Sequence, residues 1–493
     1  MSDTVDPYAF LSLPRGVPRP LSPSDRPSRG TWAQLSDLDR SPRWEDSPSS
    51  IVVGRRHDGG LYCLDDDRHA FTVAGSRAGK GECVILPNLA RYHGSVCVLD
   101  PKGENATLTA ERRGNGRGIP AGGLGQEVYV IDPFEKASVD AAYRSGFNPL
   151  ADLNPHDRLF VDLCYSIADA LVLSASKDND DHWNGMARLV LRGFIAWVAS
   201  DTAGLSHDLV EVRRLLHLPP DAFDDLLGDM LSDTERAYGV TAEMAGALQG
   251  MGDDELGSVM TTVRRNLLFL SSPDMAACLS DSIRQPDLNT WKYGGQSVFL
   301  CLPASLMGQH ARFFRLFLNR LISAVEANPK KPDIPALLLL DEMHVLGHMS
   351  QLETAAGLLA GYGLKLWSFW QDLTQLRAIY GDRWQTFIGN ASLFQSFGLN
   401  DLESLSHISD RLGPTTVLNE SSSELTVGQS IIGFEGTSYS TGSAPLLAGH
   451  EVGYHFSRQS KCQAIIYPGS PPIWMRRASY YVDNDFKAYR GTE

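Results

Sequence analysis

The sequence lacks an uncharged apolar run long enough to cross a membrane, and its first 30 residues lack the apolar segment of a secretory signal. A spanning helix needs about 20 predominantly apolar residues. The most apolar helical stretch, at 186–200, is interrupted by Arg188 and Arg192, which is typical of a buried or amphipathic helix. We therefore expect a cytoplasmic protein with no membrane span of its own.

Cysteine is also scarce. The chain has seven cysteines, an odd number that cannot all pair, and none of them forms a C-x-x-C motif. Most lie in apolar runs, such as SVCVLD at 95–100. This pattern favours buried, reduced thiols in a cytosolic protein over a disulfide framework.

Positive charge is in deficit. The chain has 44 Lys and Arg against 59 Asp and Glu, a formal net charge of −15. This balance argues against a protein that coats nucleic acid over its whole surface. It leaves room for a basic channel inside an acidic particle.

The texture of the sequence predicts a parallel α/β core interrupted by helices. Fully apolar runs at 95–100 and 127–133 each end in Asp-Pro, and further runs follow at 296–303 and 335–341. Strands that are apolar on both faces and alternate with helices indicate a parallel sheet covered on both sides. The expected parts are a Pro/Ser/Arg-rich extended arm (1–50), the first part of the α/β domain (51–150), an all-α domain (151–290), and the second part of the α/β domain with a C-terminal segment (291–493).

The stretch AGSRAGKG at 74–81 resembles a phosphate-binding loop between a strand and a helix expected from about Glu82. Such a loop needs glycines that let backbone N–H groups turn inward, a helix N-terminus, and a Lys that reaches the β- and γ-phosphates. Ala74 stands where the pattern has its first Gly, and Gly81 removes the hydroxyl that usually touches Mg²⁺. The alternative is a chance turn of small residues. The candidate nucleotide-binding residues are Gly75, Ser76, Arg77, Ala78, Gly79, Lys80 and Gly81.

Two further strand ends supply the other groups that ATP hydrolysis needs. The run ALLLLDE ends in Asp341, a candidate Mg²⁺ ligand, and Glu342, a candidate for polarising the attacking water. The run LWSFWQ ends in Gln371, which could sense the γ-phosphate as a third catalytic residue beside Lys80 and Glu342. The alternatives are a core strand with a solvated acidic pair, and a Gln that begins a helix at Asp372. The prediction is that Lys80 and the Asp341–Glu342 pair converge on one triphosphate.

These motifs together resemble the type IV secretion coupling proteins, the TraG/TraD-type ATPases of conjugation. The resemblance rests on AGSRAGKGECVILPNL, GSVCVLDPKGEN, LLLLDEMHVLG and GYGLKLWSFWQDLTQLRAIYG, and extends over roughly 30–488. It implies a RecA-like P-loop domain with an inserted all-α domain, and a hexamer with ATP and Mg²⁺ at subunit interfaces. Asp341 and Glu342 would form the Walker B pair, and a Gly at position 81 is common in that family. The implied partners are DNA, relaxase–DNA or effector proteins and the components of a secretion channel.

Two departures from the family pattern bear on this interpretation. Family members usually begin with transmembrane helices, so the expectation is a soluble variant or a shortened form, at most peripherally associated with the inner membrane. Some relatives also place an Arg before the GYGL-like turn, to reach the ATP of a neighbouring subunit, where this chain has Ala360. Arg377 and Arg383 are weak substitutes, since each is more typical of a solvated charge on a helix face.

The surface that would meet DNA is less well defined. Stacking on single-stranded nucleic acid uses aromatic side chains such as Trp367, Phe369 and Trp370, but their place in a strand flanked by helices favours core packing. Better candidates are the cations after position 100 that could line a central pore: Lys102, Arg112, Arg113 and Arg117.

Three functions remain open from sequence. The first is an ATP-driven substrate receptor and motor of type IV secretion or conjugation. The second is a nucleotide-gated docking scaffold without motor activity, which the negative charge and the missing Arg favour. The third is a DNA-pumping ATPase outside secretion. A measurement of ATP turnover would distinguish the motor from the scaffold. The identity of the neighbouring genes would distinguish a DNA-pumping ATPase outside secretion from both.

Overall fold

The computed structural model describes residues 30–56, 58–172, 181–202, 204–280, 283–422 and 437–491. Its centre is a twelve-stranded sheet with the order β2-β1-β14-β13-β10-β3-β9-β8-β4-β7-β5-β6. Every pairing from β10 to β6 is parallel. These strands are β10 (Ala391–Phe397), β3 (His69–Ala74), β9 (Leu364–Trp370), β8 (Ala336–Leu340), β4 (Val96–Leu99), β7 (Gln296–Leu300), β5 (Glu127–Ile131) and β6 (Arg144–Ser145).

The parallel strands are buried on both faces, and alternate residues enter two separate cores. In β8, Leu338 and Leu340 belong to one apolar cluster, whereas Leu337 and Leu339 belong to the other. The first cluster includes α12 (Met307–Ala327), and the second includes α2 (Leu86–Arg91) and α3 (Glu104–Arg113). Successive side chains of a strand point to opposite faces of the sheet, and here both faces are buried. The sequence therefore shows continuous apolar runs and no alternation of apolar and polar residues. The predicted parallel α/β core is confirmed.

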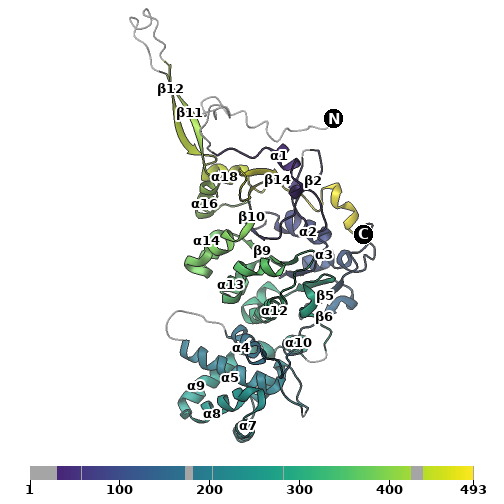
Figure 1. Ribbon diagram of the computed structural model, residues 1–493, viewed down its shortest axis with the longest axis vertical. Helices are drawn as coiled ribbons and strands as arrows, with labels where there is room; N and C mark the ends of the chain where they lie inside the picture. The colour runs from purple at the N-terminus through teal and green to yellow at the C-terminus, as the bar shows by residue number, and fades with distance from the viewer. Residues whose placement is uncertain are drawn as a thin grey trace, which may run out of the picture.

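An antiparallel extension of the sheet was not predicted from the sequence. It consists of β1 (Ile51–Arg55), β2 (Leu61–Leu64), β13 (Cys462–Ile466) and β14 (Ile473–Arg476). Strands β11 (Pro414–Ser422) and β12 (Thr437–Pro445) form a separate two-stranded ribbon that projects from one end of the molecule (Figure 1). β2 and β14 are only four residues long, so they give a weak signal in the sequence.

The described residues between β6 and β7 contain helices and no strand, as the sequence predicts. Figure 1 shows this helical region gathered at the end of the molecule opposite the β11–β12 ribbon. The helices are α4 (Phe160–Leu171), α5 (Asp181–Ala199), α6 (Leu209–Leu215), α7 (Pro220–Ser232), α8 (Val240–Gln249), α9 (Asp253–Asn266), α10 (Pro273–Cys278) and α11 (Leu288–Trp291). The domain limits at 51, 151 and 291 stay predictions.

Six further α-helices lie in the described part of the chain. They are α1 (Leu35–Asp39), α13 (Ser350–Leu358), α14 (Leu373–Tyr380), α15 (Gln385–Gly389), α16 (Leu402–Leu412) and α18 (Gly449–His455). Of the expected arm at 1–50, residues 1–29 lie outside the described residues. Among the described helices, none combines the length and apolar character that a bilayer crossing requires. All seven cysteines lie in the described part, and none is bridged.

Candidate nucleotide site

The loop that follows β3 has the backbone that a phosphate cradle requires. Gly79 has φ +96°, and a Cβ at Gly75 would lie 2.0 Å from the carbonyl oxygen of Gly398. Only glycine fits at position 75, because the end of β10 approaches the loop so closely there. Arg77 has φ 56°, a left-handed conformation that is uncommon for a residue with a side chain. This geometry gives Gly75 a physical role that the sequence pattern alone does not explain.

A helix follows the loop, as predicted, but it begins with one wide turn. Residues Gly81–Ile85 are π-helical and continue directly into α2. The N–H of Cys83 donates to the carbonyl of Gly79 at 2.8 Å, which joins the turn to the loop. A Cβ at Gly81 would meet nothing within 4 Å, so the missing hydroxyl at this position reflects no steric need. The positive end of this helix faces the loop.

Lys80 and the two carboxylates meet, as the sequence predicts. The Nζ of Lys80 lies 3.3 Å from Oε1 of Glu342 and 3.9 Å from Oδ1 of Asp341. They meet because β3, β9 and β8 are parallel neighbours, so their C-terminal ends share one edge of the sheet. Positions far apart in the chain thus lie within one ion-pair distance.

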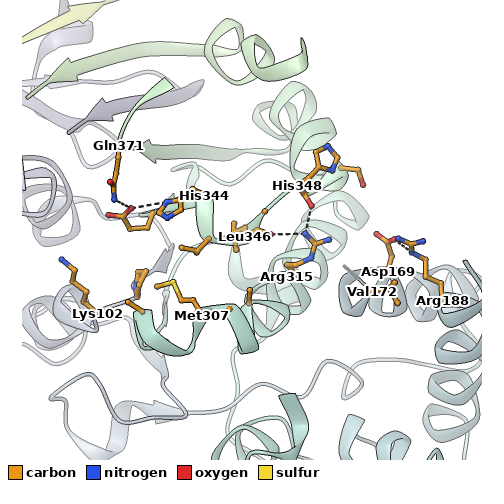
Figure 2. A pocket seen from close by; sticks show the side chains of 18 residues that line it. Lys102, Asp169, Val172, Arg188, Met307, Arg315, His344, Leu346, His348 and Gln371 are labelled. Atoms are coloured by element: carbon orange, nitrogen blue, oxygen red, sulfur yellow. Dashed lines mark hydrogen bonds and ion pairs between the residues drawn. The ribbon is translucent and has the colours of Figure 1, made fainter. Parts of the chain in front are cut away.

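Glu342 is held by polar neighbours on three sides. Gln371 donates from Nε2 to Oε2 of Glu342 at 2.8 Å, and Nδ1 of His344 lies 3.4 Å from the same oxygen. Figure 2 shows these contacts beside a cavity of about 900 Å³ that Lys102 also lines. Burial alone would raise the pKa of Glu342, but the charge of Lys80 and the hydrogen bond from Gln371 outweigh burial and lower the pKa. Glu342 is therefore ionised at neutral pH.

Asp341 has the features of a ligand for a hard cation. Burial raises its pKa to about 6, although the charges of Lys80 and Lys102 oppose the shift. Its Oδ1 has no hydrogen-bond partner among the described residues. Carboxylate oxygens are the ligands that Mg²⁺ prefers in proteins. The donor set at this position therefore fits the predicted metal.

A clamp on the loop was missed by the sequence reasoning. Arg477, which is nearly fully buried, donates from Nη1 to the carbonyl of Ala78 at 2.8 Å, and its guanidinium lies 4.6 Å from the ring centre of Phe397. It also donates to the carbonyls of Ser457 and Arg458. No spacing rule connects position 477 with position 78, so no sequence signal could have found this contact.

The prediction that Arg112 and Arg113 line a central pore is wrong. Arg113 is fully buried and donates to the carbonyls of Leu89, Tyr92 and Gly94 as well as to side chains, and Arg112 donates to the carbonyl of Ala90. Both side chains fasten α3 to its neighbours and are not available to DNA. Arg117 is exposed.

Two further predictions can be compared with the structure, one on the aromatic side chains of β9 and one on two arginines. Trp367, Phe369 and Trp370 are core residues, as the sequence favours, because each is at most 1% exposed. The exposed cations Arg377 and Arg383 form ion pairs within the chain, at 3.2 Å with Glu403 and at 2.5 Å with Glu353.

Two solved structures of coupling proteins share this fold. The plasmid coupling protein TrwB, in complex with a non-hydrolysable ATP analogue, matches with a TM-score of 0.66 at 16% identity over 97% of this chain and 99% of that chain. The unbound form of the bacterial conjugative coupling protein TrwBdeltaN70 also gives a TM-score of 0.66, at 15% identity over 92% of this chain and 94% of that chain. At this identity the likeness establishes the fold, which is the predicted RecA-like P-loop α/β fold with inserted helices.

The sequence comparisons point to one family. The Agrobacterium fabrum conjugal transfer protein TraG is 27% identical over 446 residues, which cover 87% of this chain and 63% of TraG. The VirD4 protein of the same organism is 26% identical over 448 residues, covering 88% of this chain and 61% of VirD4. The chain thus spans less than two thirds of the length of these relatives. The family described as type IV secretory system conjugative DNA transfer matches residues 31–493. This match takes in both the site and the helical region, and the chain belongs to that family.

Proposed function

We propose that this protein binds and hydrolyses ATP as a coupling protein that recruits DNA, relaxase–DNA or protein substrates and drives them into a type IV secretion channel. The observation that carries the proposal is the meeting of Lys80 with Asp341 and Glu342 at one edge of the sheet. Family membership supports the transfer role, and TrwB has been solved in complex with an ATP analogue and with ADP and Mg²⁺.

The residues divide the chemistry among them. The loop at 75–81 would hold the phosphates with its N–H groups, and Lys80 would contact the β- and γ-phosphates. Asp341 would hold Mg²⁺, which neutralises developing phosphate charge when bound. Glu342, ionised and held by Gln371, orients a water molecule and accepts its proton. Gln371 links that carboxylate to the end of β9 and can report the γ-phosphate.

The assembly and location follow from the family pattern. We propose a cytoplasmic homo-oligomer, a hexamer when active, that meets the secretion channel at the inner membrane. A hexamer would place each nucleotide between two subunits. Lys102 faces the cavity beside Glu342 and is therefore a candidate for contact with an adjacent subunit or with cargo.

The test is ATPase activity measured against protein concentration, with and without single- and double-stranded DNA. We expect specific activity to rise with concentration, because each site is completed by a neighbour, and to rise again with DNA. An intact, folded protein that neither binds nor hydrolyses ATP would refute the proposal.

A docking scaffold is the second candidate. Ala360 stands where an arginine would act on a neighbouring site, and Arg377 and Arg383 are already paired within the chain. A scaffold predicts ATP binding with background turnover at every protein and DNA concentration.

A further inference from the structure

Arg315 connects the turn that follows Glu342 with the helical region. It lies on α12, is nearly fully buried, and lines the same cavity as Glu342. Its Nη1 donates to the carbonyl oxygens of Leu346, at 3.2 Å, and His348, at 2.6 Å (Figure 2). Its Nε donates to the carbonyl of Ala170 in the last turn of α4 at 3.4 Å. One guanidinium thus contacts both the turn after Glu342 and the helical region.

Glu342 directly precedes the turn that Arg315 holds. Residues Met343–Leu346 form one 3₁₀ turn with Glu342 as its N-cap, and the N–H of Val345 donates to the carbonyl of Glu342 at 3.0 Å. Glu342 itself has φ 56° and ψ 45°, a strained conformation for a residue with a side chain. Such a conformation persists only when the surroundings impose it. Arg315 restrains the far end of this turn, because it binds the carbonyls of Leu346 and His348.

On the other side, Arg315 and Arg312 bind the open end of α4. The last carbonyls of a helix have no partner within the helix. Arg315 takes the carbonyl of Ala170, and Arg312 takes that of Leu171 at 2.8 Å. Arg312 also donates to Oδ1 of Asn266 on α9 at 3.0 Å. Among the described residues, the hydrogen bonds of Arg312 go only to the helical region, so it is a matched neighbour without a contact to the turn.

The electrostatics explain why Arg315 is sensitive to displacement. Among the described residues, no carboxylate lies within ion-pair distance of its guanidinium, and burial lowers its pKa while the charge of Asp169 opposes that shift. A buried cation without a carboxylate partner depends on its hydrogen bonds to carbonyl oxygens. If α4 moves relative to the sheet, Arg315 must follow α4 or lose a bond. Either response alters its hold on the turn.

We propose that Arg315 is a positioning residue that transmits movements of the helical region to the carboxylate of Glu342, and so makes ATP turnover respond to the state of that region. Coupling of this kind is reciprocal, so nucleotide bound at the sheet edge also changes the end of α4. The proposal rests on ATP hydrolysis at this site and assigns to the helical region a control over it.

The test compares Arg315→Met with Arg312→Met and Arg315→Lys in the full chain. We expect Arg315→Met to lower kcat about tenfold or more, as displaced catalytic groups do, while the Kd for a fluorescent ATP analogue stays within about twofold. Arg312→Met should keep kcat within about twofold. Arg315→Lys should recover part of the loss, because an ammonium can bind some of the same carbonyls. Equal kcat for the two Met variants would overturn the proposal.

Hydrogen exchange gives a readout that does not depend on turnover. In the wild type, adding the ATP analogue should change amide exchange in both 343–349 and 168–172. Arg315→Met should exchange faster at 343–349 and lose the nucleotide response at 168–172, whereas Arg312→Met should keep that response. If the wild type shows no response at 168–172, the coupling is refuted. Absence of nucleotide binding in the wild type would refute the proposed function. The positioning role would be refuted separately if amide exchange at 343–349 were unchanged in both Arg315→Lys and Arg315→Met.

Discussion

Both edges of the parallel sheet carry buried or half-buried titratable groups, but among these groups, all within the described residues, only those at the C-terminal edge form ion pairs with one another. At the N-terminal edge, burial lowers the pKa of Lys365 to about 8 and that of His69 to about 4. At the C-terminal edge, Lys80, Asp341 and Glu342 contact one another. At the first edge burial is the largest cause of both pKa shifts, and the charge of Lys365 lowers the pKa of His69 further. The second edge combines opposite charges in contact, a strained backbone at Glu342 and an adjoining cavity. Contact between oppositely charged groups beside a cavity therefore marks the site, whereas burial of a titratable group by itself does not.

The largest effect on turnover is expected from Glu342→Gln. The amide keeps the shape of the side chain but cannot accept a proton, so we expect kcat to fall about 100-fold or more. Nucleotide affinity should fall little, because Lys80 and the loop remain. ATPase assays alongside equilibrium binding of the analogue check this. Loss of binding in step with turnover would mean that Glu342 acts mainly by holding Lys80.

A smaller effect is expected from Gln371→Ala. This change removes the 2.8 Å hydrogen bond to Glu342, which helps to lower the pKa of that carboxyl. We expect about a tenfold loss of kcat and a shift of the acidic limb of the pH–rate profile to higher pH, since Glu342 then protonates more readily. Full activity with an unshifted pH–rate profile would show that Gln371 has no role in hydrolysis.

The smallest effect on turnover is expected at the opposite edge. Lys365→Met should leave ATPase activity unchanged and alter only the stability and its dependence on pH. The unfolded chain has a Lys pKa near about 10.4, so between about pH 8 and 10 it binds more protons than the folded protein, and wild-type stability rises with pH in that window.

Chemical denaturation at pH 7 and at pH 10 checks the Lys365→Met prediction. The variant should be more stable than the wild type at pH 7, and the difference should shrink by pH 10. A change in turnover with no change in this pH dependence would remove the distinction between the two edges.

The sequence predicts the C-terminal edge well because its groups follow apolar runs directly. A run such as ALLLL must end where the strand leaves the sheet, and in a parallel sheet all such ends share one side. The same reasoning could not locate Arg477, because its contact with Ala78 joins segments with no shared pattern. Arg113 was misassigned from sequence because a cation count does not reveal that backbone carbonyls surround its side chain.

The helical region illustrates a second limit. Its helices were predictable from three- and four-residue spacing, but its contact with the site depends on single atoms. Nothing in the sequence of α12 distinguishes Arg315, which binds the turn after Glu342, from Arg312, which does not. Residues one helical turn apart differ here only because the carbonyls that face them belong to different elements.

The most direct test of the shared site is binding of a non-hydrolysable ATP analogue with Mg²⁺, measured by calorimetry for the wild type, Lys80→Ala and Asp341→Asn. We predict saturable binding by the wild type, loss of binding in Lys80→Ala, and loss of the Mg²⁺ dependence in Asp341→Asn, with all three proteins folded. Equal, Mg²⁺-dependent binding by all three would contradict the claim that this amine and these carboxylates hold one nucleotide.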